Sequence, residues 1–557
     1  MSINASGWKP EMGAAGSDQA ATFTGNRALM LEEPLIFERE DYGRTGVDFE
    51  DFILPERSSG RGTAAEGGGG GAAQPSLRDT APPSSGRSPS PSKLREELLR
   101  TKPINLPGLT EPEAVRHYTR LSRQNYAIDL GLFPLGSCTM KHNPRLNERM
   151  ARLPGFADIH PLAPQSTVQG ALEVVHQLAH WLITLTGMSA VAMSPKAGAH
   201  GELCGLLAIR AALEARGDAR SVVLVPESAH GTNPATAAFC GYKVEDIPAT
   251  PEGRVGLEAL KARLGPDVAA VMITNPNTCG LFERDMKTIA DAVHAAGALV
   301  YCDGANFNAI VGRVRPGDLG VDAMHINLHK TFSTPHGGGG PGSGPVVLSA
   351  ALAPYAPLPF IEKDGDSFRL VEEETAGEHH AGTFGRMVAF HGQMGMFTRA
   401  LTYILSHGAD GLRQVAEDAV LNANYVLRSL EDVLDAPFGE SGPCMHEALF
   451  SDDGLAQGFT TLDIAKGLID EGFHPMTMYF PLVVHGAMLV EPTETESKAA
   501  LDQFIGALRS VAERAKAGDA ALKAAPIHAP RRRLDETLAA RKPVLVYKEP
   551  VQALAAE

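Results

Sequence analysis

This chain of 557 residues lacks several features that mark other classes of protein. Its six cysteines form no CxxC pair, which disfavours zinc-ribbon and dithiol redox sites. We expect them to be reduced thiols in a cytoplasmic protein. The chain has no uncharged apolar run of about 18 residues, so we predict no membrane span. The first twenty residues contain no apolar stretch of the kind found in signal peptides.

An excess of positive charge is also missing. The 50 Lys and Arg residues are outnumbered by 66 Asp and Glu residues, giving a formal net charge of −16. Proteins that bind nucleic acids usually carry a basic stripe, so we expect no nucleic-acid partner. The apolar share of 43% is ordinary for globular proteins, and the length allows more than one hydrophobic core.

Composition divides the chain into six segments. Residues 57–93 are dominated by Gly, Ser and Pro and have no apolar period, so they cannot bury enough surface to offset the entropy of ordering. We predict that they form a flexible tether. The other predicted segments are a tail with an anchoring segment (1–56), a wrapping segment with the motif GSCTMK (94–164), a large domain (165–388), a smaller α+β domain (389–525) and a C-terminal extension (526–557).

Residues 165–350 alternate between helical and strand patterns. The apolar runs SVVLVPE, VAAVMITNPN and ALVYCDGAN are separated by segments with helical spacing. Helical connections of this length imply crossovers between parallel strands. The strands are apolar on both faces, as expected when helices cover both sides. We therefore predict an α/β fold with a mostly parallel, doubly wound sheet, whose ligand binds beyond the carboxyl ends of the strands.

Polar residues stand at those predicted strand ends. Asp303 follows ALVYC, and Lys330 ends the next apolar run, AMHINLH. His230 follows SVVLVPE, and Asn275 and Asn277 follow VAAVMI. Because the carboxyl ends of parallel strands share one edge of the sheet, we expect these side chains to lie close together.

The chemistry of these groups points to one ligand. The loop SPKAGAHGE (194–202) leads into a predicted helix whose N-terminus can hold an anion such as a phosphate. A lysine amine can form a Schiff base with an aldehyde. A carboxylate can keep a pyridine nitrogen protonated, which makes the ring an electron sink, and a histidine can stack on a flat ring. Lys330, Asp303 and His230 together predict a pyridoxal-phosphate site, with no metal.

Each feature also has an ordinary structural explanation when it is taken alone. Asp303 can be a turn former, and His230 can be a capping or core histidine. The glycine run at 337–340 lacks the GK[ST] ending of a P-loop, and the context of residues 340–342 is wrong for a dinucleotide fingerprint. The order and position of the groups favour the pyridoxal-phosphate hypothesis.

Several stretches resemble one family, glycine dehydrogenase (decarboxylating), the P-protein of the glycine cleavage system. The resemblance extends over about residues 31–55 and 94–520, and it is to the second subunit of the split form, which keeps the lysine. The stretches include HKTFSTPHGGGGPGSGPV (329–346), PLGSCTMKHNPRLNE (134–148), KAGAHGELCGLL (196–207), PESAHGTNPATAA (226–238), CDGANFNAI (302–310) and EPTETES (491–497). It implies fold type I of the pyridoxal-phosphate enzymes, as in aspartate aminotransferase.

The resemblance also implies roles for single residues. Lys330 would carry the cofactor, Asp303 would pair with the pyridine nitrogen, and His230 would stack over the ring. Further expected cofactor contacts are Ala305, Ala197, Gly198, Ala199, Thr331 and Asn277, and Ser137, Thr139 and Lys141 are expected near the substrate. The sequence departs from the family pattern at Ser333 and Thr334, and at TFGR (383–386).

The implied activity is decarboxylation of glycine, with transfer of the aminomethyl group to the lipoyl arm of the H-protein and release of CO₂. The implied assembly is a heterotetramer with subunit 1, the other half of the P-protein. Lys141, Arg145 and Arg386 are candidate basic residues for recognition of an acidic carrier. Two alternatives stay open: another pyridoxal-phosphate decarboxylase or aminotransferase, and a non-catalytic assembly subunit.

Overall fold

The computed structural model describes Ile36 and residues 108–160, 162–337, 342–377, 382–529 and 531–546. The predicted tail and tether at 1–93 lie outside these residues, apart from Ile36. One compact unit contains Tyr126–Arg533 and includes every site described below. The other unit contains helices α2 (Glu111–Arg123) and α14 (Glu536–Arg541). In the described part of the chain, no helix combines the length and apolarity needed to cross a membrane.

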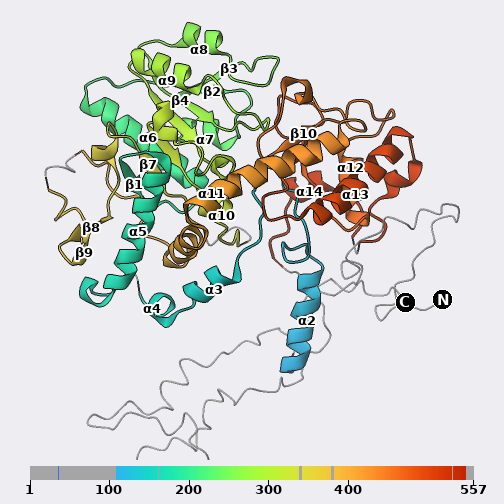
Figure 1. Ribbon diagram of the computed structural model, residues 1–557, viewed down its shortest axis with the longest axis horizontal. Coiled ribbons are helices and arrows are strands. Elements are labelled where there is room, and N and C mark those ends of the chain that lie inside the picture. Colours follow the sequence, from blue (N-terminus) through green and yellow to red (C-terminus); the bar gives the residue numbers. More distant parts are fainter. Residues whose placement is uncertain are drawn as a thin grey trace, which may run out of the picture. The chain divides into compact units, whose positions relative to one another are not determined.

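A seven-stranded sheet forms the core of one side of the larger unit, and β10 (Ala448–Phe450), α12 (Thr461–Asp470) and α13 (Lys498–Lys516) lie on the other side (Figure 1). Its strand order is β1-β7-β6-β5-β4-β2-β3. Strands β2 to β6 run parallel to one another, and β7 pairs antiparallel with β6 and β1. The strands are β1 (Ala190–Ala192), β2 (Val222–Pro226), β3 (Lys243–Ile247), β4 (Val268–Thr274), β5 (Leu299–Asp303), β6 (Ala323–His325) and β7 (Val346–Leu348). The predicted mostly parallel sheet is thereby confirmed.

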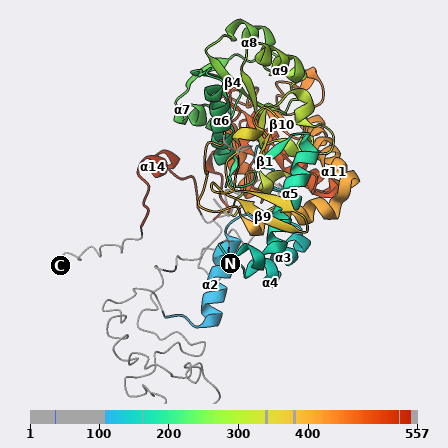
Figure 2. The same cartoon turned by 90° about the vertical axis from the view of Figure 1, so that its left-hand side faces the viewer.

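Helices cover both faces of this sheet, as the two-sided apolar strands require. Val271 and Ile273 of β4 point into one core, and Met272 of the same strand points into the other. The first face is covered by α5 (Gln169–Thr186), α8 (Leu257–Arg263) and α9 (Met286–Ala295), and the second by α6 (Gly198–Ala215) and α7 (Thr232–Phe239). Figure 2 shows α6 and α7 on one side of the sheet and α5 on the other.

Glycines bring the start of α6 close to the sheet. A Cβ atom at Gly201 would lie 2.6 Å from the Cβ atom of His325, and one at Gly205 would lie 2.4 Å from the ring of Tyr301. A larger residue at either position would push the helix away. The N-terminus of α6 therefore lies beside the carboxyl ends of β5 and β6, where its backbone N–H groups can serve a ligand.

The C-terminal part has its own core around an antiparallel sheet, β10-β12-β11. Helix α11 (Met394–Leu430) joins the two cores and bends at Gly408, where φ is 63°. Phe397 packs in the large core and Val426 in the small one. The predicted boundary at 388/389 stays a prediction, because Tyr126–Arg533 forms one compact unit. The strands here are β10 (Ala448–Phe450), β11 (Thr477–Met478) and β12 (Met488–Val490), and the helices are α12 (Thr461–Asp470) and α13 (Lys498–Lys516).

The remaining elements are short. A hairpin of β8 (Phe360–Asp364) and β9 (Ser367–Val371) packs beside α5. Helices α3 (Arg145–Ala151) and α4 (Pro154–Ala157) precede α5, and α10 (Leu328–Thr331) follows β6. The last of these carries Lys330, so the prediction that Lys330 ends a strand is wrong: β6 stops at His325, and the chain turns into a short helix before the lysine.

Candidate active site

A cavity of about 330 Å³ opens at the carboxyl ends of the parallel strands. Its wall comes from the loop after β1, from α6, from the segments after β2, β4, β5 and β6, and from the GSCTMK loop. The residues predicted from the sequence that line it are Ser137, Ala197, Gly198, Ala199, His230, Asp303, Ala305 and Lys330. The fold therefore brings the predicted Lys330, Asp303 and His230 to one cavity.

Asp303 is held as a buried anion at the end of β5. Its carboxylate accepts hydrogen bonds from the N–H of Ala305 at 2.9 Å and from Nδ2 of Asn233 at 3.1 Å. Nε2 of His325 lies 3.3 Å from Oδ1. Burial raises the pKa of Asp303, but His325, these hydrogen bonds and the charge of Lys330 outweigh it, so the pKa lies below its ordinary value. The carboxylate is ionised at neutral pH.

The amine of Lys330 is available for chemistry. Among the described residues, none forms a hydrogen bond or an ion pair with its Nζ atom. Its charge lowers the pKa of the Asp303 carboxyl group and opposes the effect of burial on the thiol of Cys138. The lysine therefore lies near an anion without being tied to it.

His230 lies at the cavity mouth with its ring oriented by α7. Its Nδ1 atom is 2.8 Å from Oγ1 of Thr232. That hydroxyl in turn lies 2.8 Å from Oε1 of Glu202, a buried residue of α6. Burial and the nearby charge of Asp303 raise the pKa of Glu202. Glu202 and Thr232 were missed from the sequence, although Glu202 is the last residue of the predicted anion loop.

His325 was also missed. Its Nδ1 atom lies 2.7 Å from the hydroxyl of Tyr301, and its Nε2 atom lies 3.0 Å from Oδ1 of Asn327. The sequence contained a signal: His325 and Asn327 stand two apart in AMHINLH, so on a strand they share one face. Both residues line the cavity.

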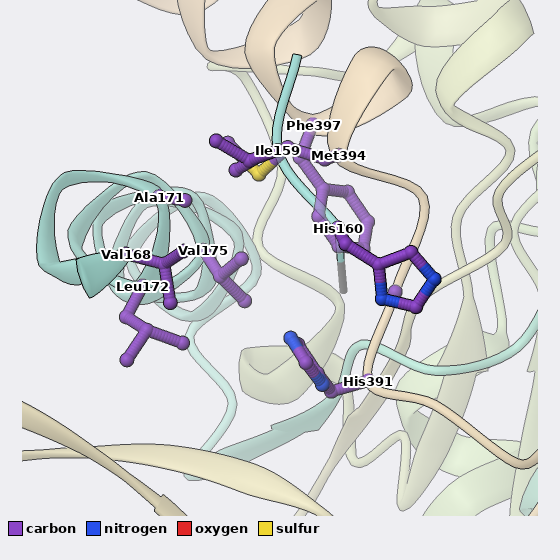
Figure 3. Close-up of a pocket in the computed structure, with 10 residues that line it drawn as sticks. Ile159, His160, Val168, Ala171, Leu172, Val175, His391, Met394 and Phe397 are labelled. Carbon is purple, nitrogen blue, oxygen red and sulfur yellow. The ribbon is translucent and has the colours of Figure 1, made fainter. Parts of the chain in front are cut away.

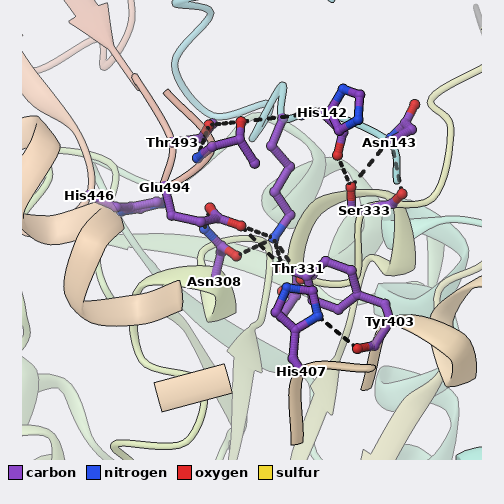
Figure 4. Close-up of polar contacts among 12 residues, drawn as sticks. His142, Asn143, Asn308, Thr331, Ser333, Tyr403, His407, His446, Thr493 and Glu494 are labelled. Atoms are coloured by element: carbon purple, nitrogen blue, oxygen red, sulfur yellow. Dashed lines mark hydrogen bonds and ion pairs between the residues drawn. The ribbon is translucent and has the colours of Figure 1, made fainter. Parts of the chain in front are cut away.

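Lys141 and Thr331 lie behind the cavity wall in a buried polar network (Figure 4). Nζ of Lys141 contacts Oε1 of Glu494 at 2.7 Å, Oδ1 of Asn308 at 2.8 Å, the carbonyl of Thr331 at 2.9 Å and the hydroxyl of Tyr403 at 3.0 Å. An ammonium group has three protons to donate, so none is left for a substrate. The structure thus does not bring Lys141 to the ligand cavity.

Asn277 also lies outside the cavity wall. Its Nδ2 atom donates to the carbonyl of Gly253 and to Glu283, and its Oδ1 atom accepts from the N–H groups of Cys279 and Leu281. The side chain is fully engaged in holding the loop after β4. The structure therefore places Asn277 in this loop and not beside Lys330.

The GSCTMK loop reaches the cavity through Ser137, whereas Thr139 is buried beneath it. Both residues have positive φ angles, 62° and 50°. The N–H of Ser137 donates to Glu447, and that of Thr139 donates to Glu491. These two glutamates come from the C-terminal part of the chain and were not singled out from the sequence.

The two basic residues predicted for carrier recognition at the surface are already paired. Arg145 contacts Asp129, and Arg386 contacts Glu372 and Glu373. A carrier would have to compete with these carboxylates.

A second cavity, of about 150 Å³, lies between the starts of α5 and α11 (Figure 3). Its wall is mostly apolar, with Leu172, Val175 and Phe397, and two histidines, His160 and His391, face it. Among the described residues, no lysine and no carboxylate lines it. The groups suited to a reaction are therefore those of the cavity at Lys330.

Comparisons with known proteins agree with this geometry. Residues 415–529 match the family described as glycine dehydrogenase, C-terminal domain, and residues 204–339 match aminotransferase class-V. The chain is 64% identical over 555 residues to "Probable glycine dehydrogenase (decarboxylating) subunit 2" of Caulobacter vibrioides, covering 99% of this chain and 98% of that protein. It is 50% identical over 458 residues to the protein of the same name from Thermotoga maritima, covering 82% and 94%.

Solved structures show the fold. A crystal structure of glycine decarboxylase (P-protein) of the glycine cleavage system, in inhibitor-bound form, matches with a TM-score of 0.62 and 24% identity, over 75% of this chain and 94% of that one. Sphingosine-1-phosphate lyase of Burkholderia pseudomallei matches with a TM-score of 0.55 and 13% identity, over 76% and 94%. The predicted fold type I is confirmed. The chain belongs to the family of glycine dehydrogenase (decarboxylating) subunit 2.

Proposed function

We propose that this chain is the pyridoxal-phosphate-binding subunit of a glycine dehydrogenase that decarboxylates glycine and passes the aminomethyl group to a lipoyl arm. The observation that carries the proposal is the amine of Lys330 in a cavity that also contains the buried carboxylate of Asp303 and the first turn of α6. Aminotransferase class-V similarity over 204–339 includes Lys330 and Asp303.

The residues present fit this cofactor. The first N–H groups of α6 have no partner within the helix and can receive a phosphate. A Cβ atom at Gly198 would lie 2.7 Å from Nδ2 of Asn327, so the approach to the helix start depends on glycine. Oγ1 of Thr274 is buried at the cavity wall without a hydrogen-bond partner among the described residues, which leaves it for a ligand.

The bound cofactor supplies an electron sink for the bond between the α-carbon and the carboxylate of glycine. The chain supplies the rest. Lys330 offers the amine for covalent attachment, and the ionised Asp303 favours a proton on a pyridine nitrogen next to it. His230, oriented through Thr232, offers a flat ring at the cavity mouth. Ser137 and Cys138 form the wall nearest to the C-terminal part.

Membership of a subunit 2 family implies a partner subunit and a place in the glycine cleavage system. We propose subunit 1 of the P-protein as that partner, in a heterotetramer, and the lipoylated H-protein as the acceptor. Of the candidate basic residues, Lys141 is buried and is therefore excluded from contact with a carrier. The cytoplasmic location stays a prediction.

The test uses the full chain with subunit 1, pyridoxal phosphate, glycine and oxidised H-protein. We expect exchange of labelled bicarbonate into the carboxyl group of glycine, and an aminomethyl group on the H-protein. Release of methylamine at the same rate without the H-protein would favour an ordinary amino-acid decarboxylase. Full activity of a Lys330→Ala subunit would support the non-catalytic alternative and contradict the proposal.

A further inference from the structure

Two glutamates of the C-terminal part reach the GSCTMK loop of the cavity. Glu447 stands directly before β10, and Glu491 directly after β12. Oε1 of Glu447 accepts a hydrogen bond from the N–H of Ser137 at 2.5 Å, and Oε2 of Glu491 accepts one from the N–H of Thr139 at 2.8 Å. Both glutamates are completely buried.

The loop that they hold has an unfavourable backbone. Ser137 and Thr139 adopt φ angles of 62° and 50°, in the left-handed region that is unfavourable for a residue with a Cβ atom. Such a conformation persists only when its surroundings stabilise it. The two carboxyl groups accept the N–H groups of just these two residues.

The start of the loop is fixed separately. Leu135 forms an antiparallel bridge with Val490, and the N–H of Gly136 donates to the carbonyl of Leu489 at 3.3 Å. Thr477 donates to the carbonyl of Gly136 at 2.7 Å. The loop is thus attached to β12 up to residue 136. Beyond that point Glu447 and Glu491 hold the N–H groups of Ser137 and Thr139, and Nε2 of His336 lies 2.8 Å from the carbonyl oxygen of Cys138.

The charges around the pair favour a neutral state for part of it. Burial raises the pKa of Glu447 and of Glu491, and each is raised further by a carboxylate close to it, while Lys330 lowers both. The adjacent His446 is neutral, since burial and Lys330 lower its pKa to about 3. Glu494 is compensated by Lys141. Burial and the neighbouring carboxylate favour the protonated form of Glu447, whose Oε1 atom still accepts from the N–H of Ser137, so this contact needs an acceptor oxygen and not a negative charge.

We propose that Glu447 and Glu491 are positioning residues of this enzyme, which hold the Ser137–Thr139 loop in its left-handed conformation and so keep Ser137 and Cys138 at the wall of the Lys330 cavity. The kinetic part of this inference rests on the proposed function, whereas the position of the loop does not.

Cys138 reports on the loop directly. It lines the cavity, and the other five cysteines are buried. Burial raises the pKa of its thiol to about 11; Lys330 lowers this pKa, and Glu491 and Glu447 raise it further. The thiol therefore reacts slowly in the native loop. The experiment measures the rate of alkylation of Cys138 by N-ethylmaleimide in the cofactor-loaded full chain, by mass spectrometry of the peptides.

Two conservative substitutions at each position separate an acceptor from a charge. Glu447→Gln and Glu491→Gln keep an acceptor oxygen at the same length and remove the ionisable group. Glu447→Asp and Glu491→Asp keep the ionisable group but withdraw the oxygen by one methylene. We expect the Asp variants to label about tenfold faster than the wild type, because the buried N–H groups of the loop lose their acceptors. The Gln variants should label only slightly faster than the wild type, since the lost carboxylate lowers the pKa of the thiol while the loop stays in place.

The Asp variants should also raise the KM for glycine more than they lower kcat, with the absorbance of the bound cofactor unchanged. Asp322→Asn is the matched control, because Asp322 is a buried carboxylate that accepts the N–H of Val300 at 2.8 Å at the opposite end of β5. It should leave the labelling of Cys138 unchanged.

Unchanged labelling in both Asp variants would overturn the inference. Gln variants that label as fast as the Asp variants would also overturn it, because the charge and not the acceptor oxygen would then hold the loop. A wild-type protein without glycine activity would contradict the proposed function, yet the labelling comparison would still decide whether the glutamates position the loop.

Discussion

Two lysines lie on either side of the same cavity wall, and their surroundings differ completely. Nζ of Lys141 is within hydrogen-bond distance of four oxygen atoms, including a carboxylate of Glu494 at 2.7 Å. Nζ of Lys330 has no such partner among the described residues, and it lies in a cavity near the ionised Asp303. The link between them is Thr331, whose carbonyl accepts from Lys141 one residue after Lys330.

The surroundings of each lysine thus determine its role in the protein. A buried ammonium with every proton committed is a structural crosslink, because moving it would leave a carboxylate unpaired. A lysine whose Nζ atom has no hydrogen-bond partner is open to covalent attachment of an aldehyde. Lys141 thus holds α10 in position, and Lys330 on the same helix is available for reaction.

The largest effect is expected at Lys330. Lys330→Ala should lower glycine-dependent CO₂ exchange by about 10³-fold or more, since the covalent attachment is lost, with little change in the free energy of unfolding. Bicarbonate exchange and urea denaturation of the same preparation measure both. A loss of stability in Lys330→Ala as large as that expected for Lys141→Met would contradict the proposed difference between the two lysines.

The next prediction concerns Asp303, the proposed partner of the pyridine nitrogen. Asp303→Asn keeps the shape and the bond from Ala305 but removes the charge. We expect the cofactor to stay bound, with its visible absorbance altered, and kcat to fall by about 10²-fold. An unchanged kcat would remove Asp303 from its proposed role.

The next prediction concerns Lys141, the lysine with a structural role. Lys141→Met leaves Glu494 buried without its cation and should destabilise the fold by about 3–5 kcal/mol. Glu494→Gln in the same chain should restore a large part of that loss, which a double-mutant cycle in urea would measure. Additive losses in the double variant would show that the pair does not act as a unit.

The smallest effect concerns two glutamates two residues apart. Burial raises the pKa of Glu494, but its pairing with Lys141 outweighs this and lowers the pKa overall. Burial raises the pKa of Glu496 to about 7. A carboxyl group with a raised pKa in the folded state favours folding while it is protonated, so its contribution is lost as the pH rises from about 4.5 to 7. Glu496→Gln should therefore stabilise the protein by about 1–3 kcal/mol at pH 8 and change little at pH 4.5. Equal effects at both pH values would contradict the assignment.

Local patterns were sufficient to predict the sheet and the residues at its edge. Asp303 and His230 follow apolar runs whose direction and order define that edge, so their meeting with Lys330 follows from topology. The role of Lys141 could not be predicted in this way, because its partners lie 167 to 353 residues away. The same holds for Ser137, whose acceptor Glu447 is 310 residues further along the chain. His325 was predictable in principle, since it stands two residues before Asn327 in the predicted strand, a spacing that would place both on one face.

The most direct test of the account is the site of cofactor attachment. The cofactor-loaded chain is reduced with borohydride, digested and analysed by mass spectrometry, with Lys141 as the internal comparison. We expect a pyridoxyl group on Lys330 alone. A pyridoxyl group on Lys141, or none on Lys330, would contradict this expectation.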